Sequence, residues 1–364
     1  NKALSYEAAK RYSNAQEMKE ALQLALRHTG MTGPAPSGLF SQTTPTVLAT
    51  WQFQCEDEIR SSACLHGALV CVGCYDNNLY ALDAHTGQFV WKLPTQGGIP
   101  SSPASWDEYV IVGSEDRSVY AVHGRQGTVA WRFATEGQVR SSPRVFFDHV
   151  FVGSDDGRLY VLQASNGRLV WKAQTTGPVR SSALVQDELV CFGSEDGTVY
   201  GLELRNGETR WRFHATMGIT SSPAPFEQLM VVGSKDRHIY ALHQRSGWAV
   251  WRHRTGHRVI ATPCVWGDRV FVGSADGNLY ALEAASGRLL WTFSTDGQIT
   301  SSVRAFGDAL YFGGVDGSVY SLDARSGKLR WRFRTGGPVV ASPAIGEGLL
   351  YIGSTDKKLY ALPL

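Results

Sequence analysis

The sequence lacks long apolar segments and an excess of either charge. No apolar run approaches the roughly 20 residues that a membrane-spanning helix needs. The 35 Lys and Arg residues nearly balance the 33 Asp and Glu residues, so no chain-wide positive field exists to attract nucleic acid or an anionic membrane. We therefore expect neither nucleic-acid binding nor membrane insertion. The 43% of apolar residues and the 39 glycines indicate a globular, turn-rich chain.

A repeat of 40 residues organises most of the chain. Trp recurs every 40 residues without a shift, and so do Tyr, Gly and Asp. The Trp series is Trp51, Trp91, Trp131, Trp171, Trp211, Trp251, Trp291 and Trp331. The other three series run from Tyr80 to Tyr360, from Gly73 to Gly353 and from Asp76 to Asp356.

Each repeat alternates short β-branched or aromatic runs with glycine turns. Runs of about five residues leave space for four strands and none for a helix of ordinary length. Pairs such as Asp156-Gly157 and Asp316-Gly317 tolerate the positive φ that a tight hairpin between the second and third strands requires. We therefore interpret one repeat as one four-stranded antiparallel blade.

The recurring Trp is predicted to lie in the fourth, outermost strand of each blade. A large flat ring at this position can pack between neighbouring blades and bury roughly 150–250 Å². We interpret Trp51 and its seven equivalents as structural residues.

The two ends of the repeat region predict how a ring of blades closes. The chain enters this region as an outer strand, residues 47–53, and leaves it after a third strand, residues 358–362. The last blade then takes three strands from residues 338–362 and its outer strand from the beginning of the region. We predict an all-β fold, an eight-bladed β-propeller over residues 47–364, with no open seam.

The repeat resembles a known family. The string D-G-x-[LV]-Y-[AS]-L-D-A-x-[TS]-G-x-x-x-W, as in residues 316–331, is similar to pyrroloquinoline-quinone-type (PQQ-like) propeller repeats. The resemblance covers residues 47–364 and implies the propeller fold. Function stays open, because the family includes quinone-dependent dehydrogenases, scaffold proteins of outer-membrane assembly and sensor domains joined to kinases.

In the dehydrogenases of this family, a Trp floor, an adjacent Cys-Cys pair, a metal site and a catalytic Asp surround the quinone above a propeller with long loops. This sequence has no Cys-Cys pair, and its strict spacing leaves no inserted loop for a quinone pocket. We expect no cofactor and no catalytic residue, and keep a quinone-dependent dehydrogenase as an alternative.

The cysteines are interpreted as core residues. Cys71 and Cys191 occupy a strand position that holds Ile, Phe, Val or Tyr in the other repeats, so they can serve as small hydrophobes. Cys64 and Cys264 are interpreted in the same way. Cys71 and Cys74 have Cys-x-x-Cys spacing, but they run along a predicted strand without the turn and second ligand pair of a metal knuckle. We therefore predict no metal site, and nothing requires an oxidising compartment.

Residues 1–27 have helical rather than strand periodicity. Ser13 and Gln16 form a capping-box pattern in front of an apolar stripe. Residues 11–18 resemble the R-[YF]-x-[ST]-A-x-[ED]-[ML] segment that opens the last helix of bacterial serine/threonine protein kinases, although Asn14 departs from the Ser/Thr position. The alternative is an amphipathic helix that caps the propeller.

The kinase resemblance implies that Arg11 anchors this helix by a buried ion pair and that a kinase domain precedes the chain. Since the chain begins without Met, we expect it to be a fragment. It contains no Gly-rich loop, H-R-D or D-F-G string, so it transfers no phosphate itself. Residues 28–46 have the composition of an irregular linker that spans roughly 25 Å on average. Because no membrane helix interrupts this linker, the resemblance implies a cytoplasmic propeller next to the attached kinase domain or its substrates.

Departures from the repeat are where we expect a ligand site, because the ring is otherwise nearly symmetrical. At the predicted start of the first strand, Arg60, Arg140 and Arg180 replace the Pro, Thr, Ile or Val of the other repeats. Four positions later, Arg144 and Arg304 replace Cys, Ala or Leu. Guanidinium groups beside a channel suit an anionic small molecule or an acidic peptide.

Two alternatives stay open at these positions. The arginines can instead pair with acidic residues of adjoining loops, namely Glu56, Asp57, Glu58 and Glu136. Aromatic residues recur at the turn between the first and second strands, and they either fill the core or form an exposed face for a protein partner. They are Trp106, Phe146, Phe226, Trp266 and Phe306.

Two non-catalytic functions therefore follow from the sequence. In the first, the propeller is a sensor whose bound ligand regulates an attached kinase. In the second, it is a scaffold that recruits or assembles proteins.

Overall fold

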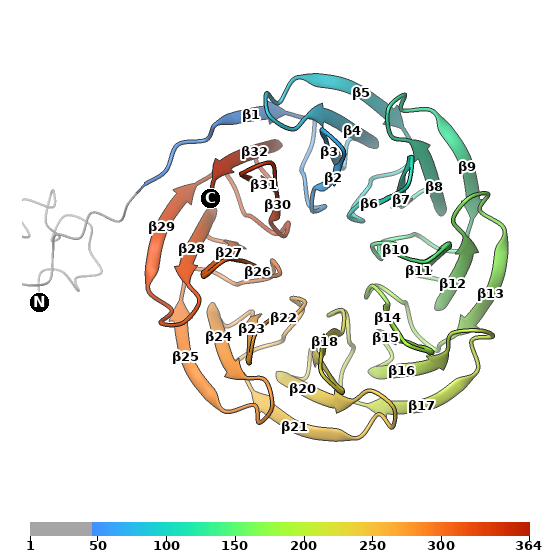
Figure 1. The fold of residues 1–364 in the computed structure, drawn as a ribbon, viewed down its shortest axis with the longest axis vertical. Helices are drawn as coiled ribbons and strands as arrows, with labels where there is room; N and C mark the ends of the chain where they lie inside the picture. The colour runs from blue at the N-terminus through green and yellow to red at the C-terminus, as the bar shows by residue number, and fades with distance from the viewer. Residues whose placement is uncertain (1–45) are drawn as a thin grey trace, which may run out of the picture. The chain divides into compact units, whose positions relative to one another are not determined.

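The computed structural model describes residues 46–364 as a ring of eight four-stranded antiparallel sheets (Figure 1). The predicted all-β fold, an eight-bladed β-propeller, is confirmed. Residues 46–364 contain no helix. The predicted helical segment, residues 1–27, lies outside the described residues, and so does the predicted linker except for its last residue.

The strands form four concentric rings around the axis (Figure 1). The innermost strands are β2 (Cys64–His66), β6 (Ala104–Trp106), β10 (Arg144–Phe146), β14 (Leu184–Gln186), β18 (Ala224–Phe226), β22 (Cys264–Trp266), β26 (Arg304–Phe306) and β30 (Ala344–Gly346). The second strands are β3 (Leu69–Gly73), β7 (Tyr109–Ser114), β11 (His149–Gly153), β15 (Leu189–Gly193), β19 (Leu229–Gly233), β23 (Arg269–Gly273), β27 (Ala309–Gly314) and β31 (Leu349–Gly353).

The outer two rings complete the blades. The third strands are β4 (Asn78–Asp83), β8 (Ser118–His123), β12 (Arg158–Gln163), β16 (Thr198–Glu203), β20 (His238–His243), β24 (Asn278–Glu283), β28 (Ser318–Asp323) and β32 (Lys358–Pro363). The outer strands are β1 (Trp51–Gln54), β5 (Phe89–Pro94), β9 (Val129–Ala134), β13 (Leu169–Gln174), β17 (Thr209–His214), β21 (Ala249–Arg254), β25 (Leu289–Ser294) and β29 (Leu329–Arg334). We number the blades in chain order, from blade 1 (β2–β5) to blade 8 (β30–β32 with β1).

Blade 8 joins the two ends of the repeat region, as the sequence predicts. Strand β1 pairs antiparallel with β32, so that Trp51 lies opposite Ala361 and Gln54 lies opposite Lys358. Every blade of the ring therefore has two neighbours, and no blade face is left open.

The hydrophobic core is divided among the junctions between blades. Eight clusters of buried side chains occur, and each combines residues of neighbouring blades. The cluster at the closure packs Val72 and Leu82 of blade 1 with Tyr351 and Leu359 of blade 8. A single blade has no core of its own, so its stability depends on its neighbours.

The recurring Trp packs across these junctions. The ring of Trp91 in blade 1 lies against Gly127 in blade 2, where an added Cβ would stand 2.7 Å from the ring. Its indole N–H donates to the carbonyl of Gly124 at 2.7 Å. Six of the eight Trp residues make this hydrogen bond to the next blade.

The recurring Asp and Tyr form a second connection between blades. In all eight blades the Tyr hydroxyl donates to the carboxylate of the Asp four residues earlier. In seven blades the same carboxylate oxygen accepts a backbone N–H from the segment that arrives from the preceding blade, as Asp196 does from Thr176 at 3.1 Å. This carboxylate therefore holds the incoming chain to the third strand.

A ring of hydroxyl groups connects the blades close to the axis. The backbone N–H of Ser62 donates to the hydroxyl of Ser102 in the next blade at 2.9 Å. Equivalent bonds occur at seven of the eight junctions, including the closure, where Ser342 donates to Ser62 at 2.9 Å.

The contact between Trp and Gly predicts that replacing two glycines with positive φ by Ala costs different amounts of stability. Gly87 (φ +70°) lies under Trp51 of the closing strand, where an added Cβ would stand 2.6 Å from the ring, whereas Gly67 (φ +57°) has nothing within 4 Å. We expect Gly67→Ala to cost about 1 kcal/mol through its backbone conformation alone. Gly87→Ala adds about 1–3 kcal/mol of overpacking. Thermal unfolding followed by circular dichroism measures both, and equal melting temperatures would contradict the packing argument.

The bond between Asp and Tyr predicts a stability loss at both ends of the pH scale. Burial and the bond to Asp196 raise the pKa of Tyr200 to about 12. Burial opposes ionisation of Asp196, but hydrogen bonds from Tyr200 and from the Thr176 and Thr198 backbones outweigh it and lower its pKa. Stability is therefore lost as pH rises from about 10 towards 12, and as pH falls below about 4. Melting temperatures against pH should fall less steeply at both ends for Tyr200→Phe, and an unchanged profile would refute the assignment.

Candidate functional site

The propeller has two faces with different loops. The segments that join one blade to the next lie on the same face as the turns between second and third strands, and we call it the connector face (residues 54–60, 74–77 and equivalents). The other two hairpin turns of each blade lie on the opposite face, which we call the hairpin face (residues 66–68, 84–88 and equivalents).

Arg60 lies on the connector face. Arg60 precedes β2 by four residues. The sequence predicted that Arg60, Arg140 and Arg180 begin the first strands, and this prediction is wrong. Regular strand pairing begins only at Cys64 and its equivalents. The Arg60 guanidinium pairs with Glu58 at 2.7 Å and lies 5.1 Å from the centre of the Tyr75 ring.

Arg140 and Arg180 share one carboxylate. Arg180 makes two hydrogen bonds to Asp155, from Nε at 2.8 Å and from Nη2 at 3.0 Å. These bonds raise the pKa of Arg180, although burial acts against them. The Nε of Arg140 lies 3.7 Å from Asp155 and 2.9 Å from Glu115.

The charges at this mouth of the channel compensate one another. Arg180 also pairs with Glu195 at 3.5 Å, and Glu195 accepts Lys235 at 2.6 Å. The paired cations are Arg60, Arg140, Arg180 and Lys235, and their carboxylates are Glu58, Glu115, Asp155 and Glu195. The alternative of pairing with acidic neighbours therefore holds for these three arginines, and it leaves little net charge for an anion.

Sequence reasoning missed three of these four acids. Of the candidates, only Glu58 pairs with one of the three arginines, while Glu136 pairs with Arg158. The other acids come from the turn between second and third strands, at the position that Tyr75 holds in blade 1. Aligning the repeats at their 40-residue spacing, instead of searching near each arginine along the chain, would have identified these acidic residues.

Arg144 and Arg304 lie inside the channel instead. They are the first residues of β10 and β26. Both border a cavity of about 480 Å³, and they are the only charged residues that line it. Its other lining residues are Ala63, Cys64, Leu65, Ser102, Pro103, Ala104, Ser105, Ser142, Pro143, Val145, Ser182, Ala344 and Ile345.

The two channel arginines belong to blades on opposite sides of the ring. Blades 3 and 7 stand four places apart in a ring of eight, so β10 and β26 lie on opposite sides of the axis (Figure 1). Both side chains are exposed, and neither takes part in any ion pair among residues 46–364. The walls of this cavity therefore carry two guanidinium groups without an ion-pair partner among residues 46–364, which makes it a candidate anion site.

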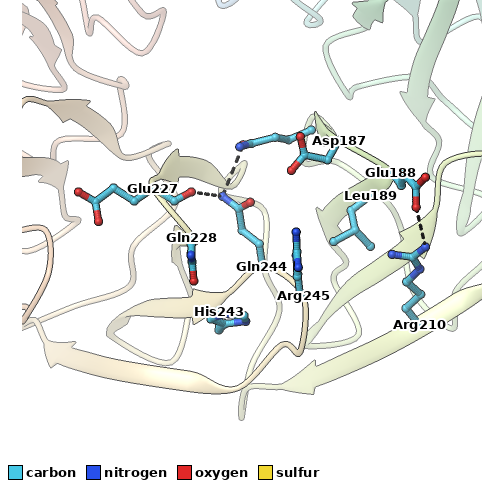
Figure 2. Close-up of a pocket in the computed structure, with 10 residues that line it drawn as sticks. Asp187, Glu188, Leu189, Arg210, Glu227, Gln228, His243, Gln244 and Arg245 are labelled. Atoms are coloured by element: carbon cyan, nitrogen blue, oxygen red, sulfur yellow. Dashed lines mark hydrogen bonds and ion pairs between the residues drawn. The ribbon is translucent and has the colours of Figure 1, made fainter.

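A polar notch on the hairpin face was not predicted. It has a volume of about 730 Å³ and lies between blades 4 and 5 (Figure 2). The Gln244 amide donates to the Glu227 carbonyl at 3.3 Å and to the Gln186 side chain at 3.4 Å, while Arg210 pairs with Glu188 at 3.4 Å. The notch carries both acidic and basic side chains, Asp187, Glu188 and Glu227 beside Arg210 and Arg245, so it is less selective for an anion than the channel cavity.

Four of the five recurring aromatic residues fill the core, and one is exposed. Trp106, Phe146, Phe226 and Trp266 pack against core clusters, but the side chain of Phe306 is 54% exposed. The most exposed aromatic residues of the hairpin face, Phe147 at 77% and Trp248 at 78%, were not among those predicted.

The channel does not fit a quinone cofactor of the dehydrogenase type. No Trp lines the channel cavity, and its only cysteine, Cys64, stands between Ala63 and Leu65 rather than in a Cys-Cys pair. No reaction step through a quinone is therefore derived for these residues.

The repeats match a known family model. The model described as outer membrane protein assembly factor BamB, of PQQ-type repeats, matches residues 45–145, 124–225, 195–306 and 286–363. The chain belongs to this family. Membership supports a propeller that binds proteins, and no curated protein matches the chain significantly.

Solved structures share the fold of this BamB-type propeller. BamB from Moraxella catarrhalis is 16% identical, with a TM-score of 0.77 over 88% of this chain and 100% of its own. The computationally designed protein Ika8 is 18% identical, with a TM-score of 0.77 over 85% of this chain and 98% of its own. Quinohemoprotein alcohol dehydrogenase from Comamonas testosteroni is 13% identical, with a TM-score of 0.75 over 89% of this chain and 78% of its own. At these identities the likeness shows the fold alone.

Helices that cross a membrane are absent from the part of the chain that the structure describes.

The shared carboxylate of Arg140 and Arg180 predicts a salt-dependent stability. Asp155→Asn leaves two guanidinium groups side by side without their common partner, so we expect a loss of about 1 kcal/mol that shrinks at high salt. Asp148→Asn is the matched control, because Asp148 is exposed and makes no ion pair among the described residues. Melting temperatures at low and high salt test this, and equal values for both variants would contradict the described pairing.

Proposed function

We propose that this BamB-type propeller is a non-catalytic ligand-binding domain whose channel holds a small dianion between Arg144 and Arg304. The observation that carries the proposal is that these two arginines are the only charged residues lining a cavity of about 480 Å³. Neither has an ion-pair partner among the described residues. A cavity of this size suits a small metabolite.

The chemistry of the walls specifies the class of ligand. Each guanidinium offers a planar fork of donors that matches a carboxylate or a phosphate. Because the two forks stand on opposite walls, a molecule with an anionic group at each end satisfies both. The remaining walls are uncharged, mostly Ala, Ser and Pro with Cys64, Leu65, Val145 and Ile345, and they contain no carboxylate that would repel it.

We further propose that the propeller is the cytoplasmic regulatory domain of a serine/threonine protein kinase. Support comes from the R-Y-S-N-A-Q-E-M string at residues 11–18, which resembles the opening of the last kinase helix. Ligand binding in the channel then alters the activity of the attached kinase domain or its access to substrates.

A second candidate function is a protein-interaction scaffold. It is favoured by the exposed Phe147 and Trp248 on the hairpin face and by the family description as an outer-membrane assembly factor. Exposed aromatic residues are common anchors of protein interfaces.

Titration calorimetry with pyrophosphate and citrate as probes tests the channel site. We expect Arg144→Ala and Arg304→Ala each to weaken binding about tenfold or more, because each removes a charge-assisted pair. Both variants copy the Ala of other repeats, such as Ala104 and Ala224, so the fold should tolerate them.

The mouth arginines provide the matched control. The variant with Arg60, Arg140 and Arg180 all changed to Ala should bind both probes nearly as well as the unaltered protein, because these residues are already paired. Loss of binding in this variant but not in the channel variants would place the anion at the mouth instead. If neither probe binds, and changing Phe147 and Trp248 to Ala removes a protein partner, the scaffold function replaces the sensor.

A further inference from the structure

The junction of blades 8 and 1 departs from the repeat at two positions that lie close together. The residue after the outer strand is Thr in six repeats, and the residue after the second strand is Ser in six repeats. At the junction of blades 3 and 4 these residues, Thr175 and Ser194, lie side by side, with their hydroxyl oxygens 3.4 Å apart. The corresponding pair at the junction of blades 8 and 1 is Cys55 and Cys74.

The two thiols lie next to a carboxylate. The sulfur atoms of Cys55 and Cys74 and one carboxylate oxygen of Asp76 all lie within 4.8 Å of one another. Cys55 is 4% exposed and Cys74 is fully buried. Among the described residues, this is the one group of three such ligands close enough to hold a metal ion.

Comparison with the seven other blades shows which contacts of Cys55, Cys74 and Asp76 are part of the repeat and which are specific to this junction. Asp76 accepts the Tyr80 hydroxyl at 2.8 Å, as its equivalents do in every blade, so the carboxylate alone indicates no ligand. The thiol of Cys74 donates to the Asp57 carbonyl at 3.2 Å, much as Ser114 donates to Gly97 at 3.0 Å. The other junctions form with Thr, Ser, Ala or Gly at these two positions. The pair of sulfur atoms is therefore specific to this junction.

Two thiols and a carboxylate are ligands for a borderline or soft divalent ion such as Zn²⁺ or Cd²⁺. Binding releases the two thiol protons to solvent and leaves two thiolates and a carboxylate around the dication. The site then carries one net negative charge. Lys357 stands next to it, because its ammonium group donates to the Glu56 carbonyl at 3.0 Å.

We propose that Cys55, Cys74 and Asp76 bind a divalent ion of the zinc class, with water as the fourth ligand.

The position of the site gives the ion a structural effect. Cys55 directly follows β1, the strand that closes the ring, and its backbone N–H donates to the Lys357 carbonyl of blade 8 at 2.8 Å. Cys74 and Asp76 belong to blade 1. A bound ion therefore ties the last blade to the first at the closure of the propeller.

The whole chain, kept reduced, is titrated with Cd²⁺ and Zn²⁺. We expect one tightly bound ion per chain by elemental analysis, a thiolate-to-cadmium absorption band in the ultraviolet, and a melting temperature raised by roughly 3 °C or more. In the double variant Cys55→Thr, Cys74→Ser the affinity should fall at least about tenfold, the absorption band should disappear and the melting temperature should not rise. This variant copies the Thr–Ser pair found at five other junctions, so it should fold.

The matched control is Cys71→Val, Cys191→Val, which removes two buried cysteines at a position where another repeat has Val231. It should bind one ion with the same absorption band as the unaltered protein. The proposal is overturned if the reduced protein binds no ion, or if the Thr/Ser variant binds as well as the unaltered protein. It is also overturned if Cys55 and Cys74 form a disulfide in air and bind no ion once reduced.

Discussion

The antiparallel pairing of β1 with β32 is the constraint on which the rest of the propeller depends. Each blade buries its apolar faces only against its neighbours, and each hydrophobic cluster is shared between blades. Without this pairing, blade 8 would lack its outer strand, and Trp51 would no longer cover Gly87 of blade 1. Main-chain pairing over four residues thus converts eight dependent units into one closed ring.

A closed and nearly symmetrical ring makes individual departures from the repeat informative. The repeated Trp, Asp, Tyr and Ser residues connect the blades, so their roles are complete without a ligand. The charges at the channel mouth also satisfy one another, because Asp155 and Glu195 each lie between two cations. Arg144 and Arg304 differ, since no side chain of the described residues neutralises them.

The channel pair and the Cys55–Cys74 pair share one property. In both cases other blades hold residues that fold equally well and lack the chemistry, Ala in the channel and Thr or Ser at the junction. The stability of the fold therefore explains neither pair. Variants that copy the residues of other repeats remove the chemistry of each pair while they preserve the fold. The Asp196–Tyr200 bond shows the opposite case, because every blade has it.

The sequence alone determined the number of blades, the four strands of each blade and the closure through the chain ends, because an exact spacing of 40 residues leaves each repeat the same local choices. It also marked the five unusual arginines. Only the tertiary structure decided which of them are free, since Arg140 and Arg180 meet carboxylates from turns of other blades, whereas Arg144 and Arg304 meet none. The contact between Cys55 and Cys74 was equally hidden, because along the chain Cys74 stands closer to Cys71. Propeller closure sets such neighbours by position in the ring, and proximity in sequence carries little information about them.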